Sequence, residues 1–382
     1  MGVSASDTGE AVRTGSRVRE EVSRSFPDRP AMVLLLCDGE TPAIPVEPPS
    51  GNGVSLMPWS HPGQSAVEAL LRAGEVFDAS ACALVIADGD DGPTTKRRLL
   101  APVLEDSFDL VCPCYATHRF EAVLTTAIVY PLTRALFGKR LRQPVGEELA
   151  VSHRFVKHLL GEAWHADPAH ALDRIWLVTE GLSRGFRVCQ AHLGPRRRQS
   201  PGAEADLSTS LAQVVGLLFH VMRLHAPAWH RMKNTETPKT YGEPETSAGD
   251  IGQPQVAPML SAFRLGFKEL GQIWGEVLSP QTLFALKRLA LAPEESFRLE
   301  DALWARIVYE FAVGYHLALM DRTLLLRSMT PLYLGWVAGF VREVRDLEPD
   351  AVEARAERLC RAFEVGKPYL ISRWRWPDRF NP

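Results

Sequence analysis

Three short runs of the sequence are apolar at almost every position, and they limit the folds that the chain can adopt. The runs lie at 31–40 (AMVLLLCDGE), 81–90 (ACALVIADGD) and 108–115 (FDLVCPCY). A strand with one face in water alternates apolar and polar residues, whereas a continuous apolar run indicates a strand that is covered on both faces. The segments 10–26 and 64–76 have helical spacing instead. The first half is therefore predicted to be an α/β sheet with helices on both faces.

The second half of the chain has helical rather than strand periodicity. Residues 207–224 predict an amphipathic helix, and the stretch 225–258 is rich in Pro, Gly, Thr and Glu, as is typical of a linker or long loop. We therefore expect an α/β domain over 1–224, a linker or long loop over 225–258 and a helical region over 259–382. Two sets of residues in the last region each fall on one helical face: Phe263, Phe267, Leu270, Trp274 and Val277, and Ile307, Phe311, Gly314 and Ala318.

The composition indicates a globular protein, and its net charge does not indicate a partner that binds through long-range electrostatic attraction. The 382 residues are 46% hydrophobic and carry a formal net charge of -3, so neither nucleic acid nor a charged membrane surface is an expected partner. The longest apolar stretch, 121–137, contains Pro131 and Arg134 and predicts no membrane span. The first residues do not resemble a signal peptide. We therefore expect a cytoplasmic protein.

Acidic residues follow two of the predicted strands at the points where the strands end. Asp38 follows the first run, and Asp88, Asp90 and Asp91 follow the second in the stretch VIADGDDGPTTK. In an open α/β sheet, ligands bind at the carboxyl ends of the strands. Carboxylate oxygens are the ligands that Mg²⁺ and Mn²⁺ prefer, usually together with phosphate oxygens and waters. The segment predicts either a metal site or an ordinary polar turn, because Asp, Gly and Pro are also typical turn residues.

Longer motifs resemble a family of bacterial glycosyltransferases. The stretches LAPVLEDSFDLVCPCYATHRFEAVLTT, RIWLVTEGLSRGFRVCQAHLG and PLYLGWVAGFV are similar to sequences of the family that includes glucosyl-3-phosphoglycerate synthase and mannosylglycerate synthase. The resemblance covers about 10–370. It implies a GT-A fold, in which a nucleotide-sugar-binding sheet with helices on both faces precedes a helical C-terminal region. It also implies transfer of a hexose, with retention of configuration, to a small acceptor such as glycerate or 3-phosphoglycerate.

The resemblance implies a donor side and a metal side of the site. Asp38 matches a family aspartate near the nucleotide base, and HPGQS matches a Pro-Gly-Lys-Gly loop at the phosphates, so that Gly63 and Gln64 are implied donor-binding residues. Gln64 replaces the lysine of that loop and lacks its charge. The family's Asp-x-Asp metal motif matches Asp88 and Asp90 after a shift of two residues, and these carboxylates are implied to hold Mg²⁺ or Mn²⁺.

Three residues of the motif HRFEAVLTT are implied to lie at the acceptor. His118, Arg119 and Thr125 match or conservatively replace the family's residues in a His-Lys-Tyr-Asp-Gly-x-Ile-Thr-Asn motif. The motif RQPVGEE is similar to Arg-Gln-Pro-Ile-Gly-Gly-Asp, a loop implied to lie at the acceptor and the donor sugar. Glu147 stands at a glycine position of that loop, where a side chain crowds the backbone. Glu148 is the expected carboxylate on this side.

Two further motifs match with a change of residue type. LDRIW is similar to Ile-Asp-Ile-Trp, with Arg174 at the position of the family aspartate and Asp173 one residue earlier. Asp173 is expected beside the sugar with Glu148. The family's later metal-binding histidine falls at Arg197 or Arg198, and Arg198 is an expected acceptor-binding residue that would pair with phosphate.

The resemblance also implies that the first nucleotide-binding strand of the family, which ends in Pro-x-Tyr-Asn, is missing here. Family members begin with this central strand, whereas residues 1–9 of this chain are small and polar. Its loss would leave a sheet edge that needs another cover. The alternatives are a start that lies further upstream and a protein that has lost donor binding.

Two functions follow from these matches. The first is a metal-dependent glycosyltransferase, whose partners are a UDP- or GDP-hexose donor and a small hydroxylated acceptor. The second is a catalytically degenerate GT-A homologue that acts as a binding or regulatory module. The changes at Ile86, Gln64, Arg174 and Arg198 all fall on donor or metal positions. A homodimer is one of the assemblies that the sequence leaves open.

Overall fold

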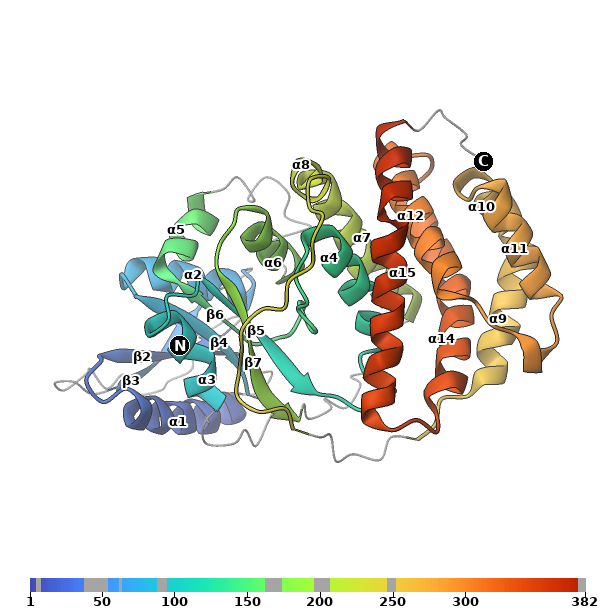
Figure 1. Cartoon of the computed structure of the whole chain (residues 1–382). Coiled ribbons are helices and arrows are strands. Elements are labelled where there is room, and N and C mark those ends of the chain that lie inside the picture. The colour runs from blue at the N-terminus through green and yellow to red at the C-terminus, as the bar shows by residue number, and fades with distance from the viewer. Residues whose placement is uncertain are drawn as a thin grey trace. The chain divides into compact units, whose positions relative to one another are not determined.

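The computed structural model describes residues 1–4, 8–37, 54–61, 64–87, 95–161, 174–195, 207–245 and 252–376 (Figure 1). The chain divides into two compact units, each built from three stretches. Unit 1 comprises Met1–Thr117, Leu141–Ser200 and Thr237–Ser247, and unit 2 comprises His118–Arg140, Pro201–Glu236 and Ala248–Pro382. The predicted domains follow one another along the chain, whereas these units interleave.

Unit 1 contains an eight-stranded sheet with the order β3-β2-β1-β4-β6-β5-β7-β8. β6 runs antiparallel to its neighbours β4 and β5, and the other neighbouring strands of the described sheet are parallel. The strands are β1 (Gly2–Ser4), β2 (Ala31–Cys37), β3 (Val54–Ser60), β4 (Ala81–Ile86), β5 (Leu110–Ala116), β6 (Leu149–Ser152), β7 (Val188–Pro195) and β8 (Thr240–Tyr241). All three predicted apolar strands therefore exist, as β2, β4 and β5.

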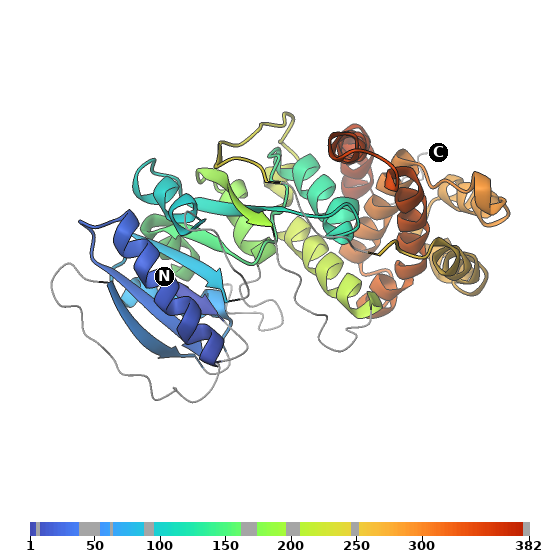
Figure 2. The same ribbon diagram turned by 90° about the horizontal axis from the view of Figure 1, so that it is seen from below.

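Helices cover both faces of this sheet, which explains the continuous apolar runs. On β2, Val33 and Leu35 belong to one core with α1 (Thr8–Ser25) and α3 (Thr95–Leu104), whereas Leu34 and Leu36 belong to a second core. Figure 2 shows α1 lying across β2 and β3. The second core contains α2 (Ala66–Val76), α5 (His153–Gly161) and α6 (Arg174–Ser183). The predicted α/β class, with helices on both faces, is confirmed.

The sheet has a central strand, contrary to the expectation that this strand is missing. β1 is only three residues long, yet it pairs in parallel with β2 on one side and with β4 on the other. Gly2 lies opposite Leu34 and Leu84, and Val3 is fully buried. The small residues at the start of the chain concealed the strand, because Gly and Ser are depleted in strands. The sheet is therefore continuous from β3 to β8.

Unit 2 is helical, as the periodicity predicts for the C-terminal region. Trp304 and Trp274 are fully buried, and the indole of Trp304 donates a hydrogen bond to the carbonyl of Ala127. The elements are η1 (Thr125–Val129), α4 (Tyr130–Phe137), α7 (Leu207–Leu224), α8 (Ala226–Trp229), α9 (Val256–Glu269), α10 (Gly271–Val277), α11 (Pro280–Ala290), η4 (Glu294–Ser296), α12 (Asp301–Leu317), α13 (Arg322–Ser328), α14 (Thr330–Val344) and α15 (Pro349–Arg375).

Two stretches of unit 2 have the length and composition of a membrane span, and the sequence analysis overlooked both. They are Leu207–Leu224 and Arg322–Val344, and 44% and 72% of the respective windows are buried within the structure. The second stretch consists of two helices, α13 and α14, and α14 packs against α9. Core helices of soluble proteins have the same apolar character, because they are covered on most sides. The cytoplasmic location stays a prediction.

One buried lysine of unit 2 lies at the ends of two helical segments. Lys367 on α15 is 7% exposed, and its ammonium group donates hydrogen bonds to the carbonyls of Leu136 at 3.4 Å and Met232 at 2.8 Å. Cations are favourable beside the unpaired carbonyls of a helix end. Burial nevertheless lowers the pKa of Lys367 to about 8, against an opposing effect of Glu364.

This pKa predicts a stability that rises with pH. Between pH 8 and the usual lysine pKa of about 10.5, the unfolded chain binds more protons at this site than the folded chain, so the free energy of unfolding increases with pH. The full difference is roughly 3 kcal/mol. Urea unfolding at pH 7.5 and 9.5 should show part of this gain in the wild type, and Lys367→Met should lack it. The exposed Lys287→Met is the control, and an equal pH response of both variants would contradict the prediction.

Candidate functional site

A buried polar cluster lies at the carboxyl ends of the parallel strands of unit 1. Its members are Lys96 near the start of α3, the half-buried Tyr115 near the end of β5, Gln143 in the loop between α4 and β6, and Glu148 directly before β6. Because β6 is antiparallel, its first residue, Leu149, lies opposite Leu84 near the end of β4. The antiparallel strand therefore brings Glu148 to the carboxyl ends of the parallel strands, where open α/β proteins bind ligands.

The carboxylate of Glu148 is fixed by a tyrosine that is itself fixed by a glutamine. The hydroxyl of Tyr115 donates to Oε2 of Glu148 at 3.2 Å, and the Glu148 N–H donates back to the tyrosine oxygen at 3.3 Å. The side chain of Gln143 bonds to both backbone groups of Tyr115, accepting from its N–H at 2.7 Å and donating to its carbonyl at 3.2 Å. Glu148 and Gln143 are 6% and 7% exposed, so this is a rigid, largely dry network.

Lys96 supplies the positive charge of the cluster. Its ammonium nitrogen lies 3.8 Å from Oε1 of Glu148, and the two side chains are 4% and 8% exposed. Glu21 on α1, which is also buried, accepts hydrogen bonds from the backbone N–H groups of Lys96 at 2.8 Å and of Arg97 at 3.4 Å. A carboxylate satisfies the free N–H groups at a helix start. Glu21 therefore holds the beginning of α3, which directly follows the acidic segment 88–94.

The loop before β6 approaches β5 so closely that it needs glycine at one position. A Cβ atom at Gly146 would lie 2.0 Å from Cγ of Pro113. Glu147 follows as a half-buried residue, and its carbonyl accepts a hydrogen bond from Nε of Arg174 at 3.1 Å. Arg174 thus binds to the backbone of the loop that carries Glu148.

A histidine on β7 lies near the same carboxyl ends of the strands. His192 is opposite Cys114 of β5 in the strand register. Burial, and then the positive charge of Arg98, lowers the pKa of His192 below its usual value. The guanidinium of Arg98 also donates to the backbone carbonyl of His192 at 3.1 Å. The imidazole is therefore neutral near pH 7, and it adds no charge to this edge of the sheet.

The predicted acceptor residues of unit 2 make local contacts. Nδ1 of His118 accepts a hydrogen bond from the N–H of Phe120 at 3.3 Å. Arg119 donates to the carbonyls of Val344 and Arg345 at 2.9 and 2.8 Å, at the end of α14. Thr125, the first residue of η1, is half-buried. These contacts give Arg119 a structural task, and the acceptor role of all three residues stays a prediction.

Of the remaining predicted site residues, the structure describes only Gln64, and six others lie outside the described ranges. Gln64 forms a turn with His61, in which its N–H donates to the His61 carbonyl at 3.1 Å and its own carbonyl contacts Nδ1 of His61 at 2.9 Å. Within the described ranges, no group of three or more His, Cys, Asp or Glu residues could hold a metal ion. The residues that lie outside the described parts of the chain are Asp38, Gly63, Asp88, Asp90, Asp173 and Arg198.

The sequence analysis proposed Glu148 as a site residue and did not predict most of the residues around it. Lys96 ends the same stretch that contains Asp88 and Asp90, yet a lone lysine after a turn is usually solvated. Gln143 stands in the motif RQPVGEE, and Tyr115 ends an apolar run. Only the antiparallel return of the chain at β6 brings these residues together, and no local pattern indicates that return.

Comparisons with known proteins give similar structures but no similar sequence. No protein-family model and no curated protein matches the chain. A solved structure of glucosyl-3-phosphoglycerate synthase from Mycobacterium tuberculosis with Mn²⁺, UDP and glucosyl-3-phosphoglycerate is 18% identical, with a TM-score of 0.39 over 59% of this chain and 79% of that chain. A second, with Mn²⁺, UDP-glucose and phosphoglyceric acid, is 19% identical, with a TM-score of 0.36 over 57% and 77%.

The buried charge pair predicts a strong energetic coupling. Removing one partner of a buried pair leaves the other charge uncompensated, which typically costs about 3–5 kcal/mol. Lys96→Met and Glu148→Gln should therefore each destabilise the protein, and the double variant should lose less than their sum, with a coupling of about 1–3 kcal/mol in urea unfolding.

A neighbouring pair, formed by Arg97 on α3 and Glu105 directly after this helix, is a matched control. Arg97 and Glu105 are also in contact, at 3.0 Å, but their side chains are 46% and 44% exposed. The same cycle with Arg97→Met and Glu105→Gln should give a coupling below about 1 kcal/mol. Equal coupling for the two pairs would contradict the buried arrangement of Lys96 and Glu148.

The close approach of the loop predicts the effect of a single methyl group. Gly146→Ala should destabilise the protein by about 1–3 kcal/mol in urea unfolding, because the added carbon overlaps the ring of Pro113. Gly275→Ala is the control, since no atom lies within 4 Å of its added carbon, and this change in a helix interior should stabilise by about 0.5–1 kcal/mol. A Gly146→Ala protein as stable as the wild type would contradict the prediction, because the loop would then accommodate the added carbon without a cost in stability.

Proposed function

We propose that this chain is a glycosyltransferase of the GT-A type, which transfers a hexose from a UDP- or GDP-sugar to a small hydroxyl acceptor with retention of configuration. The observation that carries the proposal is the buried cluster of Lys96, Tyr115 and Glu148 at the carboxyl edge of an open α/β sheet. Such an edge is where this architecture binds ligands. Lys96 of this cluster closely follows in sequence the acidic segment that contains Asp88 and Asp90, and the motif resemblance supports the same assignment.

The donor side of the proposed site combines a cation with the residues around the diphosphate. Asp88 and Asp90 would hold Mg²⁺ or Mn²⁺, since carboxylate oxygens suit these hard cations. When bound, the cation would stabilise the negative charge that develops on the diphosphate leaving group. Asp38, Gly63 and Gln64 would contact the nucleotide. The amide of Gln64 contributes hydrogen bonds there but no charge.

The sugar side of the proposed site depends on residues of the described cluster. Glu148 would accept hydrogen bonds from sugar hydroxyl groups, because its orientation is set in advance by Tyr115 and Gln143. Lys96 compensates the charge of this carboxylate, so that the site can exclude water without leaving a bare anion. A retaining transfer needs no strong general base, so Glu148 acts here by positioning the sugar. Asp173 is proposed beside it.

The acceptor side is proposed from the resemblance. Glycerate and 3-phosphoglycerate carry a carboxylate, and the latter also a phosphate. Arg198 and Arg119 are the cations proposed to bind these groups, with His118, Thr125 and Glu147 contributing polar contacts. One of the two compared structures contains phosphoglyceric acid and the other contains glucosyl-3-phosphoglycerate, so phosphoglyceric acid is the first acceptor to test.

One contact favours the alternative of a catalytically degenerate homologue. Arg174 stands where the family has an aspartate, and its guanidinium binds the carbonyl of Glu147 instead of leaving a carboxylate beside the sugar. A protein with this change could keep the fold and bind a partner or a ligand without transferring a sugar. The proposed enzyme and this alternative differ in donor binding, which can be measured directly.

Calorimetric titration with UDP-glucose, GDP-glucose and GDP-mannose, with and without Mn²⁺, tests the proposal. We expect micromolar binding of one donor that depends on the metal and disappears in Asp88→Ala/Asp90→Ala. Asp346→Ala, at an exposed acidic residue of unit 2, should bind the donor as the wild type does. Absence of heat with every donor, in a protein that is folded by circular dichroism, would reject the enzyme and favour the degenerate homologue.

A further inference from the structure

One end of unit 2 gathers positive charge from two segments that are far apart in the sequence. The segments 223–233 (RLHAPAWHRMK) and 365–376 (VGKPYLISRWRW) each contain three Lys or Arg residues and no Asp or Glu. The first runs from the end of α7 through α8, and the second is the last part of α15 together with Trp376. In Figure 1, α8 and the end of α15 lie at the top of unit 2. The fold therefore collects the cations of both segments at one end of this unit.

Contacts between buried side chains hold the two segments together. The rings of Trp229 and Trp374 meet edge to face, with their centroids 5.3 Å apart, and His316 at the end of α12 stacks on Trp374 at 4.1 Å. The ammonium group of Lys367 donates a hydrogen bond to the carbonyl of Met232 at 2.8 Å. Trp229 and Trp374 are 0% and 8% exposed. This packing fixes the positions of the two segments relative to each other.

The positive charge of this region affects two histidines that border it. Burial, followed by the charge of Arg223, lowers the pKa of His316 below its usual value. Burial, followed by the charges of Arg375 and Lys367, lowers the pKa of His230 in the same way. Both rings are therefore neutral near pH 7, and both lie in a region of positive potential.

Four exposed cations of these segments form no ion pair within the described part of the chain. They are Arg223, Arg231, Lys233 and Arg375. Other exposed cations of unit 2 do have carboxylate partners, such as Arg298 with Glu343 at 3.2 Å. Glu364, whose charge acts on Lys367, is bound to Arg134. The four cations can therefore bind an external anion without first breaking a contact to a described carboxylate.

Apolar side chains are exposed directly beside these cations. Trp376, Leu224 and Met232 are 58%, 53% and 37% exposed, and each is next to one of the four cations in the sequence. A nucleic acid would neutralise the cations but leave the aliphatic side chains in water. The interface of a bilayer takes up both kinds of group, because it presents anionic phosphates above acyl chains. Tryptophan in particular is enriched at that interface, since its ring is apolar and its N–H is polar.

We propose that this end of unit 2 binds the surface of anionic phospholipid bilayers, with the four exposed cations at the lipid phosphates and Trp376, Leu224 and Met232 inserted among the headgroups. The net charge of -3 gives no sign of this partner, because acidic residues elsewhere outweigh the local cations. Charges in water act over only about 10 Å at 0.1 M salt, so the cations that face the bilayer determine the attraction. This inference does not depend on the proposed sugar transfer.

Flotation of the full chain with lipid vesicles tests the proposal. Vesicles of phosphatidylcholine alone should not bind the chain, whereas vesicles with roughly a third of phosphatidylglycerol should bind it at about 0.1 M salt and more weakly at about 1 M salt. Arg231→Gln/Lys233→Gln should weaken this binding on the order of 25-fold, because each cation near an anionic membrane contributes about fivefold. Lys287→Gln/Arg288→Gln, at exposed residues of α11, removes the same charge and should bind as the wild type does.

The fluorescence of Trp376 reports on insertion independently of the cations. Lipids with brominated acyl chains should quench the wild type. Trp376→Phe should lose most of this quenching while its affinity changes by less than about threefold, since Phe keeps an apolar ring. Equal binding to both kinds of vesicle, equal affinities of the two double variants, or quenching that Trp376→Phe retains would each overturn the proposal.

Two competitors distinguish the bilayer from other anions. Single-stranded RNA at an equal phosphate concentration and inorganic phosphate at millimolar concentration should both leave the chain on the anionic vesicles. Displacement by the RNA would overturn the proposal and assign the surface to nucleic acid. Displacement by inorganic phosphate would overturn it in favour of a site for small anions.

Discussion

The covering of the central sheet on both faces is the constraint on which the rest of unit 1 depends. Alternate residues of β2 enter two separate cores, one with α1 and α3 and the other with α2, α5 and α6. A parallel sheet covered in this way exposes only its edges and the two ends of its strands. Polar chemistry is therefore confined to strand ends and the loops that follow them, and the buried cluster around Glu148 lies at such an end.

The position of that cluster follows from one reversal of chain direction. β6 is antiparallel, so the residue before it, Glu148, meets the carboxyl ends of β4 and β5. Burying a carboxylate there is costly, and the nearby ammonium of Lys96 and the hydroxyl of Tyr115 offset that cost. The buried carboxylate of Glu21 is likewise stabilised, because it accepts a hydrogen bond from the backbone N–H of Lys96 at the start of α3. Each buried charge at this edge is thus matched by groups from a different element.

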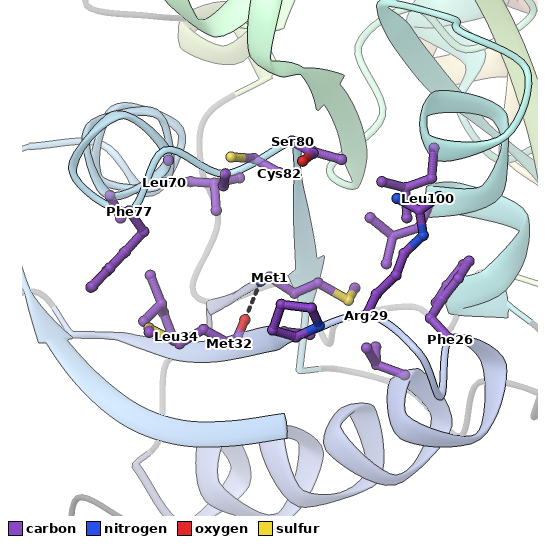
Figure 3. Close-up of a pocket in the computed structure, with 18 of the residues that line it drawn as sticks. Met1, Phe26, Arg29, Met32, Leu34, Leu70, Phe77, Ser80, Cys82 and Leu100 are labelled. Carbon is purple, nitrogen blue, oxygen red and sulfur yellow. Dashed lines mark hydrogen bonds between the residues drawn. The ribbon is translucent and has the colours of Figure 1, made fainter. Parts of the chain in front are cut away.

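The central strand connects the two ends of the sheet. The carbonyl of its last residue, Ser4, accepts a hydrogen bond from the N–H of Ala87, and the amine of Met1, the residue before the strand, lies in the apolar pocket between β2 and β4 (Figure 3). Residues 1–4 therefore link this pocket to Ala87, the residue before the proposed metal-binding segment.

The sequence by itself determined the class of unit 1 and the helical nature of the C-terminal region. Short continuous apolar runs are typical of strands that are covered on both faces, and 3.6-residue spacing indicates a helix with one buried face. Motifs are local, so they could also propose single positions such as Glu148 as site residues. The tertiary structure alone decided that β1 is the central strand, that β6 returns antiparallel, and that Lys96, Tyr115 and Gln143 surround Glu148. These features depend on pairing between segments far apart in the chain, and the free energy of such pairing does not appear in any local pattern of residues.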